Sequence, residues 1–328
     1  MISFCQFGAG RIGQIHAENI ARHPRARLRT VVDVNAAAAK ALAERYGAAV
    51  GDPANALADP AIDAVLIASS TDTHSALVEA AARAGKPVLC EKPLDLDRKR
   101  AEASLAVAEK AGITLMLGFN RRFDPNFAKL QQQLRAGRIG KLEMLTITSR
   151  DPGPPPLDYV KVSGGLFRDM MIHDFDMARW LLGEEPVSVF AAASSLVDPA
   201  IGAAGDVDTA VVTLKTAAGT LCQITNSRRA TYGYDQRIEA LGSGGMLRAG
   251  NVVESTLEFA GESGVVSEKP LHFFLERYAA AYVRELDHFI EAVEKRKPPM
   301  VGGKDGVRAL VLAEAALESS KSGRAVAV

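Results

Sequence analysis

The chain has 328 residues, of which 48% are hydrophobic, so it is long enough for two domains with substantial cores. Its 39 basic and 39 acidic side chains balance without a long run of one sign, which argues against nucleic-acid or anionic-membrane binding. The three cysteines lie in apolar segments without paired spacing, and no apolar run is long enough to span a bilayer. A strand pattern starts at once where a signal peptide would stand, so we expect a protein of the reducing cytoplasm without nucleic-acid or membrane partners.

The first 120 residues alternate apolar strand patterns with helical patterns. Strands are predicted at Ile2–Phe7, Leu28–Val34, Asp63–Ala68, Val88–Cys90 and Thr114–Phe119. Helices are predicted at Ile12–Arg22, Ala36–Tyr46, His74–Ala84 and Asp97–Ala111, and a glycine follows each of the last three. This rhythm predicts an α/β fold in which residues 1–120 form a doubly wound parallel sheet of the Rossmann type. Ligands of such sheets bind beyond the carboxyl ends of the strands.

Residues 121–328 have the pattern of a second, α+β domain with a large, mostly antiparallel open sheet. Strands are predicted at Glu143–Ser149, Val187–Ser194, Thr209–Thr216, Thr220–Asn226, Arg237–Leu241 and Ser255–Phe259. Helices are predicted at Pro125–Arg135, Met170–Leu182, Phe273–Lys295 and Lys304–Ser320. Short glycine-containing turns separate several of the strands, which favours hairpins.

The most specific motif is Gly8-Ala9-Gly10-Arg11-Ile12-Gly13, which directly follows the first predicted strand. In such a motif the first glycine permits a tight turn, the second lets a pyrophosphate approach, and the third lets helix and strand pack closely. The amides at the start of the following helix attract phosphates. Asp33, after the second strand, can bind ribose hydroxyls and repel a 2′-phosphate, which predicts NAD in preference to NADP. The alternative is a simple βα turn with an exposed aspartate.

Glu91-Lys92-Pro93 follows the predicted strand Val88–Cys90, at the edge of the sheet where a dinucleotide would lie. Proline restricts the residue before it to an extended backbone, which fixes the direction of the Lys92 side chain. An ammonium group at this edge can stabilise the negative charge on an oxygen that loses its proton. The alternative is a surface lysine before a turn proline.

Asp169 and His173 are four residues apart at the start of a predicted helix, so their side chains share one face. A histidine oriented by a carboxylate can take a proton from an alcohol while a hydride leaves for a nicotinamide. Alternatively, Asp169 caps the helix and His173 packs in the core. Asp174 and Asp176 adjoin the histidine on differing helix faces, and no second histidine or cysteine has matching spacing, so we expect no metal site.

Three other clusters are polar and lie near predicted strand ends. Asn120-Arg121-Arg122-Phe123-Asp124 and Tyr232-Gly233-Tyr234-Asp235-Gln236 carry donors that suit a polyhydroxy substrate. A solvated hinge and aromatics packed on a sheet face are the alternatives. Ser70-Thr71-Asp72-Thr73-His74 follows the strand ending at Ala68, where it can line a nicotinamide ribose or form an ordinary helix start capped by Thr71 or Asp72.

Together these motifs resemble the glucose–fructose oxidoreductase/inositol dehydrogenase/rhizopine-catabolism family over almost the whole chain. The glycine motif and Glu91-Lys92-Pro93 are typical of the whole family, whereas the later motifs are similar to its bacterial inositol 2-dehydrogenases. These later motifs are Gly118-Phe119-Asn120-Arg121-Arg122-Phe123-Asp124, Ser149-Arg150-Asp151-Pro152, Gly164-Gly165-Leu166-Phe167-Arg168-Asp169, Ile172-His173-Asp174-Phe175-Asp176 and Tyr232-Gly233-Tyr234-Asp235-Gln236.

The resemblance implies NAD-dependent oxidation of a secondary hydroxyl of a cyclic polyol, with myo-inositol as the expected substrate and a homotetramer as the expected assembly. It implies a catalytic group in which His173 accepts the proton, Asp169 orients it, and Lys92 holds the reacting oxygen. The implied substrate contacts are Lys92, Arg121, Asp151, Asp169, His173 and Tyr232. The implied cofactor contacts are Gly8, Gly10, Arg11, Ile12, Gly13, Asp33, Ser69, Thr71, His74, Glu91 and Lys92.

One departure from the family concerns the substrate. Ser149-Arg150-Asp151-Pro152 stands where some inositol dehydrogenases read His-Arg-Asn-Pro, so another inositol isomer or an aldose is an alternative substrate. Two alternatives belong to other classes. An NAD-dependent glycosidase would retain its cofactor without net release of NADH, and a non-catalytic NAD-binding sensor would have little reason to keep Lys92, Asp169 and His173 together.

Overall fold

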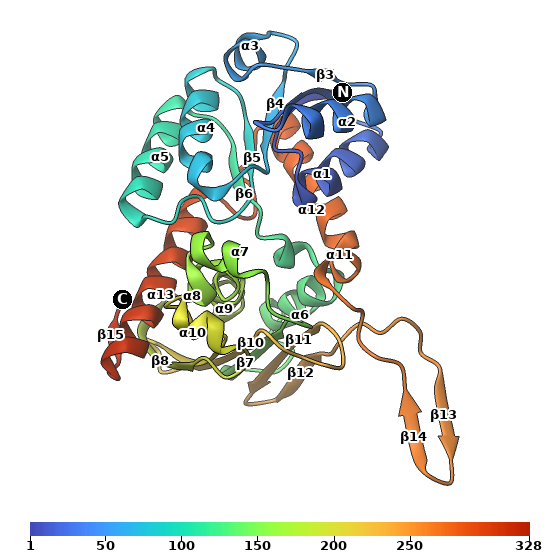
Figure 1. The fold of residues 1–328 in the computed structure, drawn as a ribbon. Coiled ribbons are helices and arrows are strands. Elements are labelled where there is room, and N and C mark those ends of the chain that lie inside the picture. The colour runs from blue at the N-terminus through green and yellow to red at the C-terminus, as the bar shows by residue number, and fades with distance from the viewer. The chain divides into compact units, whose positions relative to one another are not determined.

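The computed structural model describes residues 1–328, and their contacts divide the chain into two units. Unit 1 comprises residues 1–120 and 281–310, and unit 2 comprises residues 121–280 and 311–328 (Figure 1). Residues 121–328 were predicted to form one domain, whereas residues 281–310 pack with unit 1. They do so through an apolar helix face, in which the ring of Phe289 lies 6.0 Å from that of Phe4.

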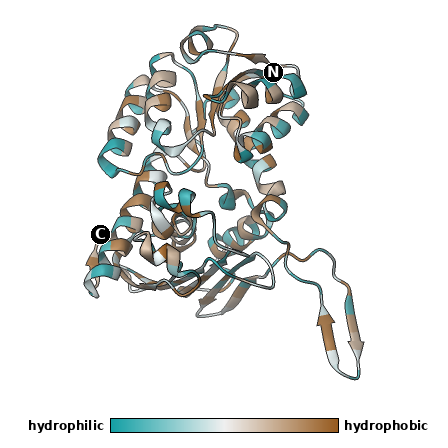
Figure 2. Cartoon of the chain, in the orientation of Figure 1, coloured by the Kyte–Doolittle hydropathy of each residue, from teal (hydrophilic) through white to brown (hydrophobic).

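Unit 1 is built on a parallel sheet of six strands in the order β3-β2-β1-β4-β5-β6, which confirms the predicted Rossmann fold. The strands are β1 Ile2–Phe7, β2 Ala26–Val32, β3 Ala49–Val50, β4 Ala64–Ile67, β5 Val88–Cys90 and β6 Leu115–Leu117. Figure 2 shows these strands in brown, flanked by helices with teal outer turns. The sequence analysis missed β3 because a strand of two residues carries no periodic pattern.

The helices of unit 1 mostly begin and end where capping residues predict. They are α1 Arg11–Arg22, α2 Ala36–Tyr46, α3 Pro53–Ala58, α4 Thr71–Arg83, α5 Arg98–Ala111 and α12 Ala279–Lys295, followed by the first part of α13 Gly303–Ser322. Asn35, Asp52 and Asp97 accept backbone N–H bonds at the starts of α2, α3 and α5. Gly47 and Gly112 end α2 and α5 with a φ of +67°, a left-handed conformation that glycine adopts without strain.

Unit 2 contains a sheet of seven strands in the order β12-β11-β7-β10-β9-β8-β15. The strands are β7 Leu142–Arg150, β8 Pro186–Ser194, β9 Thr209–Thr216, β10 Leu221–Ser227, β11 Asp235–Gly242, β12 Gly245–Ala249 and β15 Val326–Ala327. Only the β7–β10 pair is parallel, which confirms the mostly antiparallel sheet. Two-residue β15 and the short β12 were not predicted.

The helices of unit 2 gather on one face of this sheet (Figure 1). Besides the end of α13, they are α6 Pro125–Arg135, α7 Leu157–Val162, α8 Gly165–Asp169, α9 Ile172–Leu182, α10 Pro199–Ala203 and α11 Phe274–Arg277, with a 3₁₀ turn η1 at Asn120–Phe123. The opposite face leaves large apolar side chains exposed, among them Phe190 at 44% and Val211 at 41%. One face of the sheet therefore forms the core and the other remains uncovered.

Three predicted elements of the second half have different bounds in the structure. The helix predicted at Met170–Leu182 starts only at Ile172, because the N–H groups of Met170 and Met171 bond to Leu166 and close α8. The helix predicted at Phe273–Lys295 is split into α11 and α12. The strand predicted at Ser255–Phe259 starts later, as β13 Glu258–Gly261, and pairs only with β14 Gly264–Ser267 in a projecting hairpin (Figure 1).

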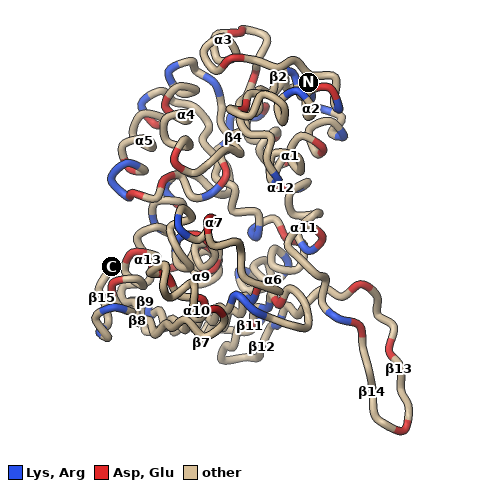
Figure 3. Tube along the Cα trace, viewed as in Figure 1, with Lys and Arg blue, Asp and Glu red and all other residues tan.

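The charged side chains are distributed along the structure without a large region of one sign, as the balanced composition predicts (Figure 3). Lys and Arg alternate with Asp and Glu along both units (Figure 3). None of the helices combines the length and the apolar composition that are needed to cross a bilayer.

Candidate active site

The glycine motif forms the turn between β1 and α1, and each glycine has a different surrounding. Gly8 has a φ of +103°, and a Cβ there would lie 2.3 Å from the Ala68 carbonyl oxygen. A Cβ at Gly13 would lie 2.2 Å from the Gly8 carbonyl oxygen, so α1 and β1 pack closely at this point. A Cβ at Gly10 would meet no atom within 4 Å. The open side of Gly10 is therefore where a pyrophosphate could approach the backbone.

The start of α1 leaves backbone donors for an anion. Its N-cap residue is Gly10, so no side chain caps the amides of Arg11, Ile12 and Gly13. Asp33 follows β2 and lies beside this turn: its carboxylate accepts the Ala9 N–H at 2.6 Å and the Asn35 N–H at 2.7 Å. The donors and the carboxylate fit the phosphate and ribose groups of a dinucleotide.

The loop after β4 is tied to the loop after β5 by His74. The ring is 1% exposed, with Nδ1 2.8 Å from the Pro93 carbonyl oxygen and Nε2 3.1 Å from that of Ser69. His74, predicted as a cofactor contact, therefore occupies both ring nitrogens with backbone groups and positions the two loops. The Ser69 hydroxyl bonds that of Thr73 at 2.7 Å, and Thr71 is the first residue of α4.

Lys92 stands at the carboxyl edge of the sheet, after β5, and its peptide bond to Pro93 is cis. The neighbouring Glu91, also predicted as a cofactor contact, has a protein partner that the sequence analysis did not identify. Its Oε1 lies 2.8 Å from Nε2 of the buried His16 in α1. This pair links two motifs that are 75 residues apart.

Unit 2 contains a network of buried polar side chains. The Arg121 guanidinium, in η1, donates to Asp174 at 2.5 Å and to the Ser149 hydroxyl at 2.8 Å. Asp174 also accepts from the Ser149 hydroxyl at 2.6 Å and from the Asn226 amide at 2.9 Å. The sequence analysis missed Asn226, whose only signal is its inward position on β10.

Asp176, like Asp174, has an arginine partner. Arg122 donates to its two oxygens at 2.8 and 2.5 Å, in the two-pronged geometry that matches guanidinium to carboxylate. The two acids beside His173, which the sequence analysis examined as metal ligands, thus belong to salt bridges.

Asp169 is the last residue of α8, and His173 lies in the first turn of α9. One continuous helix was predicted to carry both residues, but they lie on two separate helices. The Asp169 carboxylate accepts the Tyr159 hydroxyl at 2.8 Å and pairs with Arg228 at 3.4 Å. Tyr159 and Arg228 were not predicted, since neither stands at a spacing that indicates contact with Asp169.

Asp151 follows β7 and is anchored by its N–H, which donates to the Ser227 carbonyl at 3.0 Å. Its side chain is only partly accessible, and burial raises its pKa to about 7. Arg228 opposes this rise, whereas the Asp169 carboxylate adds to it. Asp151 and Asp169 are thus electrostatic neighbours, with the Arg228 guanidinium acting on both.

Tyr232 and Tyr234 lie in different surroundings although they are two residues apart. Tyr232 is 40% exposed and bonds Arg150 at 2.9 Å and Asp235 at 2.7 Å. Tyr234 is buried and stacks edge-on against Tyr278 at 6.0 Å, and the cation of Arg121 acts on it. Tyr234, which was not assigned a role, therefore neighbours the Arg121 network.

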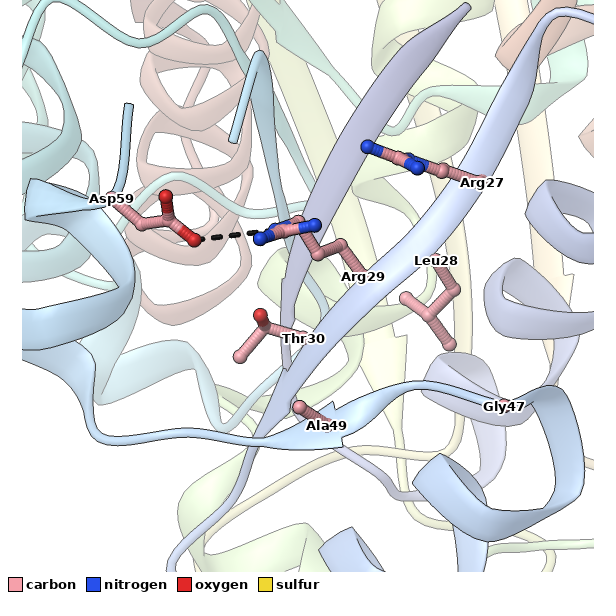
Figure 4. Close-up of a pocket in the computed structure, with 7 residues that line it drawn as sticks. All are labelled: Arg27, Leu28, Arg29, Thr30, Gly47, Ala49 and Asp59. Carbon is pink, nitrogen blue, oxygen red and sulfur yellow. Dashed lines mark hydrogen bonds and ion pairs between the residues drawn. The ribbon is translucent and has the colours of Figure 1, made fainter. Parts of the chain in front are cut away.

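Two surface depressions lie outside the glycine turn and the predicted catalytic residues. One of about 350 Å³ lies along β2 upstream of Asp33, where Arg29 pairs with Asp59 at 3.2 Å (Figure 4). The other, of about 390 Å³, lies on the sheet of unit 2 and includes Tyr232 and Val211. Neither includes a residue of the glycine turn, Lys92, Asp169 or His173.

Comparisons with known proteins identify the family of this chain. Residues 2–119 match the family described as "Oxidoreductase family, NAD-binding Rossmann fold", and residues 127–248 match "GFO/IDH/MocA C-terminal domain". An inositol 2-dehydrogenase of Rhizobium meliloti is 52% identical over 100% of this chain and 99% of its own, and a myo-inositol 2-dehydrogenase of Thermotoga maritima is 51% identical over 97% and 96%.

A solved structure extends the likeness to three dimensions. The scyllo-inositol dehydrogenase of Lactobacillus casei, with bound NAD(H) and scyllo-inositol, has a TM-score of 0.93 and 30% identity over 100% of this chain and 99% of that one. The resemblance predicted from the sequence is confirmed: the chain belongs to the GFO/IDH/MocA family of oxidoreductases.

Proposed function

We propose that this protein is an NAD-dependent inositol 2-dehydrogenase that oxidises myo-inositol to 2-keto-myo-inositol. The observation that carries this proposal is the full-length similarity, at 52% and 51% identity, to relatives named for that activity. The glycine turn with Asp33 would hold the cofactor, and the polar network of unit 2 would hold the polyol.

The glycine turn and Asp33 would hold NAD, which would supply the acceptor for the hydride of the carbinol carbon. The chain's own part is to hold the polyol and to manage its proton. His173 would take the proton of the reacting hydroxyl, and the Lys92 ammonium would stabilise the negative charge on its oxygen. Asp169, held by Tyr159 and Arg228, would orient His173.

The remaining polyol hydroxyls need acceptors and donors at fixed positions. Asp151, with a pKa of about 7, supplies carboxyl oxygens, and Arg121 supplies guanidinium N–H groups whose direction Asp174 and Ser149 fix. Tyr232, whose hydroxyl is held by Arg150 and Asp235, would supply a further hydroxyl group to the polyol. Ser149 is the position at which the chain departs from some inositol dehydrogenases, so the isomer preference depends on this network.

For the assembly we propose a homotetramer in the cytoplasm. Paired strands on the uncovered sheet face bring Phe190 beside Thr213 and Val211 beside Thr225, a mixed apolar and hydroxyl surface. An uncovered face of this kind is a suitable surface for a second copy of the chain. The three cysteines are free and buried, as expected in a reducing compartment.

The proposed function is tested by following the NADH absorbance band. Purified protein with NAD is offered myo-inositol, scyllo-inositol, D-chiro-inositol, glucose and xylose. We expect reduction with myo-inositol. Reduction of NAD with only another compound of this panel would change the assigned substrate and leave the assigned reaction unchanged. No reduction would favour a sensor or a glycosidase, and cofactor retained through purification would then indicate the glycosidase.

A further inference from the structure

Three titratable side chains form a buried cluster in unit 1 that adjoins Lys92. His16 comes from α1, Glu91 directly precedes the lysine, and Glu285 comes from α12. One donor atom of each lies within 4.8 Å of those of the other two. His16 is 1% and Glu285 0% exposed. Neither residue has a part in the reaction described above.

Glu91 connects this cluster to the lysine. Its Oε1 lies 2.8 Å from His16 Nε2, and its Oε2 lies 3.3 Å from the Lys92 amide nitrogen, which donates to it. Gly118 packs against the same carboxylate, because a Cβ at Gly118 would lie 2.9 Å from Oε2. The Glu91 side chain is thus held from several sides, and its orientation bears on the backbone of Lys92.

Glu285 is a buried carboxyl group whose two oxygens have no hydrogen-bond partner. An ionised carboxylate in such a place costs several kcal/mol, and the group takes up a proton instead. Burial, reinforced by the charge of Glu91, raises the pKa of Glu285 well above its usual range. A neutral acid has a proton to donate, and an oxygen of the Glu91 carboxylate lies within 4.8 Å of one of Glu285.

The arrangement of His16, Glu91 and Glu285 is better suited to a proton shared between two side chains than to a bound metal ion. With Nε2–H donated to Glu91, the His16 Nδ1 is a bare acceptor, and this atom has no hydrogen-bond partner. A metal-bound histidine would carry its proton on Nδ1 and would need an acceptor there. The ring of Tyr282, in α12, packs edge-on against that of His16 at 5.6 Å.

We propose that His16 and Glu285 are positioning residues for Lys92 that act through Glu91, with Glu285 a neutral acid that shares its proton with the Glu91 carboxylate. This proposal rests on the proposed function in so far as Lys92 is catalytic. Removing either partner frees Glu91 to turn and shifts the Lys92 backbone. A displacement of about 1 Å at a reacting group can cost on the order of 100-fold in rate.

The protonation of Glu285 is tested without catalysis. The infrared difference spectrum between the wild type and Glu285→Gln at neutral pH should contain the carbonyl band of a protonated carboxylic acid. Carboxylate bands in its place would overturn the proposal. So would one equivalent of a divalent metal that survives dialysis in the wild type and is lost from Glu285→Gln.

The effect on Lys92 is tested by kinetics with matched variants. Glu285→Gln and His16→Gln, which keep a donor, should retain kcat within about threefold, whereas Glu285→Ala and His16→Ala should lose about tenfold or more. The pH profile of kcat should shift in the alanine variants and return in the glutamine variants, with NAD affinity unchanged throughout. Unchanged kcat and profile in both alanine variants would contradict the proposal.

Two controls separate folding and assay failures from this result. Glu294→Ala, an exposed acid on α12, should leave kcat at the wild-type value. If the alanine variants fail to fold, the glutamine pair with the infrared spectrum decides. If no polyol is oxidised by the wild type, the proposed function fails, while the infrared result still tests the shared proton.

Discussion

The guanidinium of Arg121 and the carboxylate of Asp174 form an ion pair of 2.5 Å in which the side chains are only 5% and 0% exposed. Ser149 and Asn226 satisfy the remaining capacity of the carboxylate. Buried charges are tolerated only when they are paired and hydrogen-bonded in this manner. The pair therefore fixes the direction of the Arg121 guanidinium.

Replacing Asp174 by asparagine should destabilise unit 2 strongly. The change leaves the Arg121 charge buried without its partner, which costs about 3–5 kcal/mol in the free energy of unfolding. Denaturant unfolding in the absence of ligands measures this loss of free energy of unfolding. Lys40→Ala, which removes an exposed pair at 3.7 Å on α2, serves as control and should change stability by at most about 1 kcal/mol. Equal effects of the two would refute the role of burial.

Gly10→Ala and Gly8→Ala should separate cofactor binding from folding. The Gly10 methyl group meets no protein atom, so this variant should fold normally and lose NAD affinity. The Gly8 methyl group would overlap the Ala68 carbonyl in a left-handed backbone, so this variant should lose thermal stability. Melting temperature and NADH fluorescence titration distinguish the two. Unimpaired NAD binding in Gly10→Ala would place the pyrophosphate elsewhere.

Asp33→Ala should weaken NAD binding and narrow its advantage over NADP. The carboxylate is fixed by two backbone N–H groups beside the glycine turn, where it meets a ribose. Loss of a charged hydrogen bond costs about 1.5–3 kcal/mol, or roughly 10–100-fold in affinity. The ratio of KM values for NAD and NADP measures the effect, with Asp52→Ala at the cap of α3 as control. An unchanged ratio would contradict the cofactor assignment.

The pKa of Asp151 predicts a pH-dependent stability. Burial raises it to about 7, against about 4 in an unfolded chain, so the folded protein binds the extra proton between these values. The stabilisation associated with this proton is complete below about pH 4 and is lost as the pH rises through about 7. Asp151→Asn should remove this loss, so its stability relative to the wild type should increase from pH 5 to pH 8. A constant difference in denaturation midpoint would argue against the raised pKa.

His173→Ala should abolish turnover and leave NAD affinity nearly unchanged. The expectation follows from its proposed role as proton acceptor, since a histidine in that role acts on the polyol and not on the dinucleotide. Steady-state rates and NADH titration measure the two quantities. His23→Ala, which removes a ring paired with Asp287 at 3.2 Å in unit 1, is a suitable control. Loss of NAD binding in His173→Ala would show that the residue is structural.

Local sequence patterns predicted most of the fold, including the glycine turn. Ile2–Phe7, Ala36–Tyr46, Pro125–Arg135 and Thr209–Thr216 are found with the predicted bounds, because periodicity and capping residues act over a few positions. The glycine turn is equally local. Its three glycines have the surroundings that the motif requires.

The polar part of the site could not be predicted in the same way. The side chains of Tyr232 and Tyr234 would point to the same side only if the backbone between them were extended. Gly233 has a φ of +126°, so the two side chains do not follow the alternation of a strand. Asp169 and His173 were expected on one helix, but the chain closes α8 between them. His16, Glu91 and Glu285 are brought together from three distant segments, and no spacing within one sequence reports such a contact.

The return of residues 281–310 to unit 1 has a consequence for how this protein can be made and recombined. A ribosome that has released only the first 120 residues has not yet supplied Phe289, whose ring packs beside that of Phe4. The amino-terminal half must wait for nearly the whole chain before its core is complete. For the same reason it cannot be exchanged between relatives as one contiguous cassette: a functional chimera must inherit both segments from the same parent.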